Sequence, residues 1–177
     1  MKKIVAVICM CGSGKSEVVK YFVDKGYQKV YFGNVVLNEI KSKGLDVNEV
    51  TERKVREELR DRYGMGAMAI KSIDKVREYY IKGNVVIESL YSWREFKILK
   101  SEFGDRFKLL AVYTTKNIRY SRLKQREVRP LTYDEAVSRD VSEIERLDKG
   151  GPIAYADYLV INDSTLDDLY KQLEKIE

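Results

Sequence analysis

CMCGSGKS, at residues 9–16, connects the apolar run IVAVI at residues 4–8 to the helix-patterned EVVKYFVDKG at residues 17–26. A buried strand, a glycine-containing loop and the start of a helix, in that order, are typical of a phosphate-binding loop. Gly12 and Gly14 allow the tight turn in which successive backbone N–H groups converge on one anion. The positive end of the following helix dipole strengthens the same field. The stretch therefore predicts a nucleoside triphosphate site.

The polar side chains of this loop fit the same chemistry. Lys15 supplies a mobile positive charge for the outer phosphates, and the Ser16 hydroxyl is placed to coordinate Mg²⁺. Cys9 stands at the first position of the motif G-x-x-x-x-G-K-[ST], where glycine is usual. We expect Cys9 to stay in the strand while the glycine-rich half of the loop wraps the phosphates; an ordinary glycine turn before a surface lysine is the alternative. The predicted nucleotide contacts of the loop are Cys11, Gly12, Ser13, Gly14, Lys15, Ser16 and Glu17.

Length and composition are those of a small globular protein. The 177 residues fit one domain, and 44% apolar with 34% charged residues is ordinary for a chain with a buried core. No apolar run approaches the ~20 residues that span a bilayer, so we expect a cytoplasmic protein without a membrane partner. Histidine is absent and both cysteines, Cys9 and Cys11, lie in the loop, which excludes histidine-based catalysis and a disulfide framework. The net charge of +5 suits nucleic acid and polyphosphate ligands equally.

Apolar runs recur between amphipathic stretches along the whole chain. The runs are continuous rather than alternating, which indicates strands covered on both faces, and the helical patterns between them indicate crossover connections. The sequence therefore predicts an α/β fold of three layers, in which helices cover both faces of a five-stranded parallel sheet. Ligands of such sheets bind at the carboxyl ends of the strands. The predicted strands are IVAVI at 4–8, KVYF at 29–32, NVVIE at 84–88, FKLLAVY at 107–113 and DYLVI at 157–161.

Helical patterns separate the first three strands. One helix is expected at about 13–25, a second at about 34–43, and residues 51–82 form a highly charged helical region. Gly64 and Gly66 interrupt this region, which indicates either a kink between packed helices or a close approach of the backbone to a ligand. The expected buried stripe of the region is Val55, Leu59, Ile70, Ile73 and Val76.

VIESLYSW, at residues 86–93, follows the third strand. Glu88 ends that strand beside the expected phosphate site, where a second carboxylate holds Mg²⁺ directly or through water. Capping of the helix that starts near Ser92 is the alternative role of this carboxylate. Tyr91 and Trp93, the only tryptophan, either stack on a base or pack against the sheet. We therefore expect the metal to be shared between Glu88 and the loop serine.

A basic segment follows the fourth strand. Six basic residues and one acid lie at 116–129, and such a cluster needs a polyanion or acidic neighbours. Pro130 breaks the helix, Thr132 with Glu135 forms a capping box for the next one, and GGP at 150–152 ends it. Two helices joined in this way form a lid that supplies charge and excludes water; a solvated basic face and nucleic-acid binding are the alternatives. The arginines expected on one face of the first helix are Arg119, Arg122 and Arg126.

Three features together resemble the dephospho-CoA kinase family. They are the phosphate-binding loop, the R-x-x-x-R spacing of Arg122 and Arg126, and the late stretch ADYLVINDSTLDDL at 156–169. The chain is also similar along nearly its whole length to the adenylate-kinase-related P-loop proteins of archaea, including the Val-Val pair at 35–36 and L-R-x-x-Y-G-x-G at 59–66. Both groups have the nucleoside monophosphate kinase-like fold, with a core sheet, an acceptor-binding helical region and a lid. The resemblance implies ATP as phosphoryl donor and a nucleotide-like acceptor.

The chain departs from these families on the acceptor side. Asn34 follows Gly33 where the resembled kinases have an aspartate, which in dephospho-CoA kinases is similar in role to a general base for a ribose hydroxyl. Leu37 stands where adenylate kinases have a phosphate-binding arginine, and Tyr91 also replaces an arginine. Ser89 replaces the glycine of an acid-glycine pair. Nucleoside monophosphates and dephospho-CoA both stay candidate acceptors.

The sequence thus favours one P-loop kinase domain over residues 1–177, with an acceptor-binding region at about 34–82 and a lid at about 117–150. We expect Mg²⁺-dependent transfer of the ATP γ-phosphoryl group to a nucleotide-like small molecule, with neither a membrane nor nucleic acid as the favoured partner. A nucleotide-binding regulatory ATPase without an efficient acceptor reaction is the alternative. The expected catalytic residues are Lys15, Arg122 and Arg126, of which Arg122 also contacts the nucleotide. The expected acceptor contacts are Gly33, Asn34, Arg60, Glu88, Tyr91 and Arg129.

Overall fold

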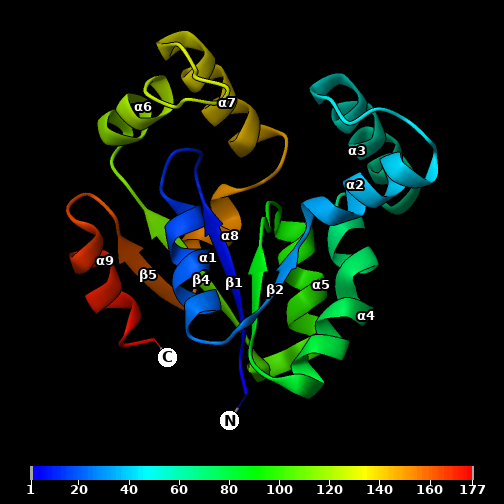
Figure 1. The fold of residues 1–177 in the computed structure, drawn as a ribbon, viewed down its shortest axis with the longest axis horizontal. Helices are drawn as coiled ribbons and strands as arrows, with labels where there is room; N and C mark the ends of the chain where they lie inside the picture. The colour runs from blue at the N-terminus through cyan, green and yellow to red at the C-terminus, as the bar shows by residue number, and fades with distance from the viewer. Residues whose placement is uncertain (1, 177) are drawn as a thin grey trace.

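A five-stranded parallel sheet forms the centre of the protein in the computed structural model, which describes residues 2–176 (Figure 1). The strand order is β2-β3-β1-β4-β5, so the first strand lies in the middle, and every neighbouring pair is parallel. The predicted α/β sheet is confirmed, and its strand bounds differ from the apolar runs by at most one residue at either end. The strands are β1 Ile4–Cys9, β2 Gln28–Tyr31, β3 Val85–Glu88, β4 Phe107–Tyr113 and β5 Tyr158–Ile161.

Helices connect the strands and cover both faces of the sheet (Figure 1). They are α1 Lys15–Asp24, α2 Gly33–Ser42, α3 Glu49–Tyr63, α4 Ala67–Lys82, α5 Trp93–Phe103, the short 3₁₀ helix η1 Gly104–Arg106, α6 Lys116–Lys124, α7 Tyr133–Glu145, α8 Gly150–Ala154 and α9 Leu166–Leu173. Within residues 2–176, none of these helices combines the length and the apolar character that crossing a bilayer requires.

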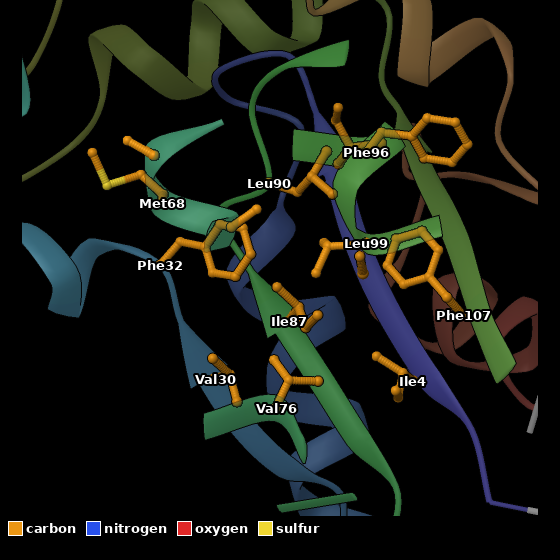
Figure 2. Packing of buried hydrophobic residues seen from close by; sticks show 14 of the residues in the cluster. Ile4, Val30, Phe32, Met68, Val76, Ile87, Leu90, Phe96, Leu99 and Phe107 are labelled. Carbon is orange, nitrogen blue, oxygen red and sulfur yellow. The ribbon is translucent and has the colours of Figure 1, made fainter. Parts of the chain in front are cut away.

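The two faces of β1 contribute to two separate hydrophobic clusters. Ile4, Ala6 and Ile8 pack in a cluster with residues of α2 to α5, whereas Val5 and Val7 pack in another with residues of α1 and α9. Because helices cover both faces, every residue of β1 is buried, which explains its continuous apolar sequence. Figure 2 shows the first cluster, in which sheet and helix side chains meet: Ile4, Val30, Phe32, Met68, Val76, Ile87, Leu90, Phe96, Leu99 and Phe107.

One edge of the sheet positions the loop that follows β1. Val7 lies opposite Glu88 of β3, and Cys9 lies opposite Val112 of β4, so the loop starts between the ends of these two strands. β1 ends at Cys9, which confirms that this cysteine belongs to the strand. Helices α2 and α3 extend beyond this edge on one side, and α6 and α7 extend beyond it on the other (Figure 1).

Helix ends follow the local signals of the sequence. The break between α3 and α4 falls at Gly64 to Gly66, as predicted. The predicted capping box of α7 is also confirmed, because Thr132 Oγ1 accepts a hydrogen bond from Glu135 N at 3.3 Å and Glu135 Oε2 accepts one from Thr132 N at 2.7 Å. Such caps satisfy backbone donors that a helix start leaves unpaired.

Two details of the prediction are wrong. Ile70 is exposed, and the buried face of α4 instead carries Ala69, Ser72 and Val76, which are spaced three and four residues apart. The small side chains of Ala69 and Ser72 let this helix approach its neighbours closely. Residues 150–152, expected to end the lid helix, begin the separate short helix α8.

Removal of core side chains from the sheet is expected to destabilise the protein strongly. Ile87 of β3 is fully buried, so Ile87→Ala should lower the free energy of unfolding by about 2–5 kcal/mol through lost burial and a residual cavity. Ile81, on the last turn of α4, is 75% exposed, and Ile81→Ala should change stability by less than about 0.5 kcal/mol. Urea denaturation of both variants measures the difference, and equal losses would contradict the assigned burial.

Candidate functional site

The loop at residues 10–14 has a shape that requires glycine at two positions. Gly12 has φ +89° and Gly14 has φ +88°, both in the left-handed region. A Cβ atom on Gly12 would lie 2.9 Å from the carbonyl oxygen of Arg119, and one on Gly14 would lie 2.2 Å from Asn162 Nδ2. Backbone conformation and close packing therefore both demand the absence of a side chain, and the loop lies directly against α6 and the end of β5.

Two buried side chains hold the loop from the neighbouring strands. Asn162 Nδ2 donates a hydrogen bond to the Ser13 carbonyl oxygen at 2.9 Å. Thr114 Oγ1 lies 3.2 Å from the same oxygen and 3.1 Å from the Asn162 carbonyl oxygen. Because Thr114 directly follows β4 and Asn162 directly follows β5, the sheet itself fixes the loop. The sequence analysis missed both residues, although a polar residue directly after a buried strand is the signal that marks them.

Because neighbouring atoms pack closely against Gly12 and Gly14, substituting these glycines should destabilise the protein more than substituting other glycines of the same conformation. Gly26 has φ +86° but no atom within 4 Å of the Cβ position, so Gly26→Ala should cost only the left-handed strain of about 1–2 kcal/mol. Gly12→Ala should cost more, because the Arg119 carbonyl must also move. Urea denaturation measures the free energy of unfolding of both variants. Equal decreases would contradict the prediction, because they would show that the loop accommodates the added methyl group.

Lys15 begins α1, and its ammonium group reaches the end of β3. Nζ donates a hydrogen bond to Ser89 Oγ at 2.6 Å, lies 3.5 Å from Glu88 Oε1, and lies 5.5 Å from the centre of the Tyr91 ring. Burial lowers the pKa of Lys15, but Tyr91 and Glu88 outweigh it and raise that pKa above its ordinary value, so the ammonium group stays charged. Lys29 Nζ holds the other carboxylate oxygen of Glu88 at 2.6 Å.

Ser89 takes an unusual backbone conformation for a residue with a side chain. Its φ is +72°, in the left-handed region. Outside glycine this conformation costs about 1–2 kcal/mol. The strained residue places its hydroxyl group beside the Lys15 ammonium.

The loop lines a cavity of about 230 Å³, which we call the loop cavity. Residues 11–16 all contribute to it, whereas the predicted nucleotide contacts Glu17 and Arg122 lie outside its lining. Four lining side chains are cationic and two are carboxylates, so the cavity favours an anion. Its other lining residues are Cys9, Met10, Glu88, Leu90, Tyr91, Arg126, Arg139, Glu143 and Lys149.

The three arginines expected on one helical face have different surroundings. Arg119 is buried, pairs with both carboxylate oxygens of Asp140 on α7 at 2.9 and 2.6 Å, and donates to the Cys11 carbonyl oxygen at 3.0 Å. Arg122 Nη1 is buried and has no hydrogen-bond partner within residues 2–176. Arg126 follows the end of α6 with Nη1 3.9 Å from Cys11 Sγ, so the prediction of one shared helical face is wrong. Asp140 is the acidic neighbour that the basic segment requires.

A second cavity of about 250 Å³, which we call the helix cavity, is lined by residues of α2, α3 and α7. Arg60 Nε is buried without a hydrogen-bond partner in the described part of the chain, and burial lowers the pKa of this guanidinium. Arg56, one helical turn away, lines the same cavity. Asn34 and Arg129 are exposed and lie outside its lining. The predicted acceptor contacts that do line it are Gly33, Arg60 and Tyr91.

Three residues line both cavities: Tyr91, Arg139 and Glu143. Lys149 Nζ donates to Glu143 Oε2 at 2.7 Å and lies 4.6 Å from the centre of the Tyr91 ring, and Arg139 Nε lies 3.3 Å from Glu143 Oε1. Lys149 is 1% exposed and Glu143 is 5% exposed. The sequence analysis missed Arg139, Glu143 and Lys149. The spacing of one helical turn between Arg139 and Glu143 can be seen in the sequence. No local pattern, however, indicates that Lys149 is buried against Glu143.

Glu95 fixes the backbone at Tyr91. Its Oε2 accepts hydrogen bonds from Tyr91 N at 2.7 Å and Ser92 N at 3.1 Å, and Ser92 Oγ accepts one from Glu95 N at 3.1 Å, which completes the capping box of α5. Burial raises the pKa of Glu95 to about 7, although the two backbone donors oppose the shift. Trp93 stacks on Phe96 with ring centres 4.9 Å apart, so of its two predicted roles it takes the packing one.

The raised pKa of Glu95 predicts a stability that falls with pH. Between about pH 4.5 and pH 7 the unfolded chain loses the Glu95 proton while the folded protein keeps it, so the free energy of unfolding decreases as pH rises through this window. Glu95→Gln keeps an oxygen acceptor for both backbone donors and removes the titration. Relative to the wild type, the variant should gain stability from pH 5 to pH 8, by about 1.4 kcal/mol for each unit of pKa shift removed. Urea denaturation at both pH values measures this, and parallel profiles would contradict it.

Oxygen donors near the loop suit a hard cation. Within residues 2–176, no group of three or more His, Cys, Asp and Glu side chains is placed to bind a metal by itself. Ser16 and Glu88 both line the loop cavity. Mg²⁺ commonly binds through one or two protein oxygens together with substrate phosphates and water, so this pair fits Mg²⁺.

Solved structures share the fold. TT1252 from Thermus thermophilus matches with a TM-score of 0.70 and 16% identity over 99% of this chain and 96% of that one. A shikimate kinase from Bacteroides thetaiotaomicron matches with a TM-score of 0.67 and 12% identity over 98% and 97% of the two chains. A dephospho-CoA kinase from Campylobacter jejuni matches with a TM-score of 0.57 and 16% identity over 99% and 96%. At these identities the likeness shows the fold alone, which is that of P-loop kinases.

Similarity in sequence shows the family. No profile of a known protein family matches the chain. A UPF0200 protein of Thermococcus onnurineus is 33% identical over 177 residues, which cover 98% of this chain and 95% of that protein. A UPF0200 protein of Pyrococcus horikoshii is 32% identical with the same coverage, and one of Methanosarcina mazei is 33% identical over 71% of this chain and 67% of that protein. The chain therefore belongs to the UPF0200 family of archaeal proteins.

Proposed function

We propose that this protein is a kinase that uses ATP and Mg²⁺ to phosphorylate a nucleotide-like small molecule. The observation that carries the proposal is the meeting of two cavities at Tyr91, one lined by the phosphate-binding loop and the other by Arg56 and Arg60. A phosphoryl donor in the loop cavity and an anionic acceptor in the helix cavity would meet at this junction. The fold shared with shikimate kinase and dephospho-CoA kinase supports the same reaction class.

On the donor side, the loop at residues 11–16 binds the triphosphate, and Lys15 neutralises its outer phosphates. Arg126 lines the same cavity from the segment after α6. Arg122 Nη1 would lie 3.9 Å from a Cβ atom on Gly14, so this unpartnered guanidinium is next to the loop and available to a phosphate. Together these groups compensate the charge that develops on the transferred phosphoryl group.

Mg²⁺ supplies further neutralisation of the phosphates and orients them. Ser16 and Glu88 are the residues that would hold it. Lys15 and Lys29 balance the Glu88 charge. Phosphates that attract Lys15 would leave a Glu88 oxygen available to the cation.

On the acceptor side, residues 34–82 form the acceptor-binding region and residues 117–150 form the lid. Arg56 and Arg60 offer two guanidinium groups to an anionic group of the acceptor, a role for which planar guanidinium forks are well suited. Tyr31 adds an aromatic surface on which a base can stack. A nucleotide-like compound fits this combination of anion-binding and aromatic groups.

A nucleotide-binding regulatory ATPase without an efficient acceptor reaction is the second candidate. The observation that favours it is Leu37, which lines the helix cavity at the position where the resembled adenylate kinases have a phosphate-binding arginine. ADP release measured across nucleoside monophosphates and dephospho-CoA separates the two functions. Tight ATP binding without acceptor-dependent turnover would favour the regulatory ATPase.

Lys15→Ala should lower the affinity for Mg·ATP by about tenfold or more, because it removes a partly buried positive charge from the proposed phosphate site. Lys20→Ala is the matched control, since Lys20 lies on the same helix, is exposed and lines neither cavity. Isothermal titration calorimetry measures both variants. An absence of binding heat in the wild-type protein would remove the basis of the kinase assignment.

A further inference from the structure

Phosphoryl transfer must take place where the loop cavity and the helix cavity meet. Three side chains line both of them, namely Tyr91, Arg139 and Glu143. A phenol and a guanidinium keep their protons at neutral pH, whereas a carboxylate accepts one. Glu143 is therefore the member of this set that can take a proton from an attacking hydroxyl group.

The other carboxylates near the site are placed for different tasks. Glu88 lines only the loop cavity, where it is the proposed metal ligand. Glu52 lines only the helix cavity, and Glu95 lines neither because its carboxylate binds backbone donors. Asn34 is not a base and lies outside both cavities. Within residues 2–176, Glu143 is the carboxylate that both cavities share.

We propose that the acceptor is an alcohol that carries an anionic group, and that Glu143 accepts the proton of the attacking hydroxyl. The anionic group binds Arg56 and Arg60 in the helix cavity, which directs the hydroxyl toward the junction. This inference rests on the proposed kinase function and narrows its acceptor to compounds phosphorylated on oxygen bound to carbon.

The ion pairs around Glu143 explain how this carboxylate becomes available. Lys149 and Arg139 neutralise it at 2.7 and 3.3 Å, and both of these cations also line the loop cavity. A triphosphate in that cavity attracts them, as it attracts Lys15 away from its own carboxylate. Glu143 is then free to face the acceptor, so the base is unmasked when the donor is bound.

The chemical step balances with these groups alone. The acceptor oxygen forms a bond to the γ-phosphorus of ATP, while the bond from that phosphorus to the β,γ-bridging oxygen breaks. ADP leaves with the electron pair of the broken bond. The hydroxyl proton passes to the Glu143 carboxylate and from there to water after the product departs. The product is a phosphate monoester, whereas a monophosphate acceptor would give a phosphoanhydride.

The test compares two classes of acceptor with Mg·ATP. One class holds anionic alcohols, with shikimate, glycerate and dephospho-CoA as probes; the other holds the four common nucleoside monophosphates. Phosphorus NMR distinguishes a phosphate ester from a phosphoanhydride. We expect ester formation with a member of the first class. Only anhydride products, or no ester from any alcohol although Mg·ATP binds, would overturn the inference.

Variants of Glu143 test its role at saturating ATP. Glu143→Gln should lower kcat by about 10²- to 10⁴-fold without weakening Mg·ATP binding, because the carboxylate acts in the chemical step and its loss frees Lys149 and Arg139 for the phosphates. Glu143→Asp should restore part of kcat. Glu145→Gln is the matched control, since Glu145 is exposed on the same helix and lines neither cavity. An unchanged kcat in Glu143→Gln would contradict the proton-accepting role.

Loss of Glu143 alone leaves the Lys149 ammonium buried without a carboxylate, which can destabilise the fold. The double variant Glu143→Gln/Lys149→Met removes both charges and should regain stability while kcat stays low. Recovery of kcat in the double variant would show that Glu143 only balances charge. Failure of the wild-type protein to bind Mg·ATP is a separate result, since it would refute the kinase function itself rather than the choice of acceptor.

Discussion

Burying an ammonium group costs several kcal/mol unless a carboxylate compensates it, and the fully buried Lys149 and the partly buried Lys15 both lie beside the loop at residues 10–14. Lys15 is compensated by Glu88 from the end of β3, and Lys149 by Glu143 from α7. Ion pairs thus connect the start of α1 to the end of β3, and α7 to the residue that precedes α8. A ligand that draws either lysine away must replace the charge of its carboxylate partner, which favours an anion.

The parts of the structure that follow local rules could be predicted from the sequence. Continuous apolar runs gave all five strands because each strand is buried on both faces. The tight turn between β1 and α1 could be predicted because the two glycines and the following helix specify its geometry within eight residues. The capping box at Thr132 and the helix break at Gly64 could be predicted for the same reason, because short sequence patterns specify both.

The parts that could not be predicted depend on packing between distant segments. Asn162 holds Ser13 across 149 positions of sequence, and no local pattern specifies that contact. The basic segment was expected to need either a polyanion or acidic neighbours, and only the packing of α7 shows that Arg119 pairs with the acidic Asp140. The buried position of Lys149 depends in the same way on how α8 follows α7. These contacts link α6 and α7 to each other and to the loop, so the basic segment is less of an open cationic surface than its composition indicates.

At Ser89 an unfavourable backbone conformation is combined with a hydrogen bond that positions the Lys15 side chain. Glycine at this position would remove the strain of the left-handed backbone. It would also remove the hydroxyl group that accepts the hydrogen bond from the Lys15 ammonium. A screen for thermal stability alone would therefore favour Ser89→Gly, in which the Lys15 side chain is less well positioned. Engineering of this fold for durability should leave position 89 untouched and seek its gains on the outer surface of the molecule.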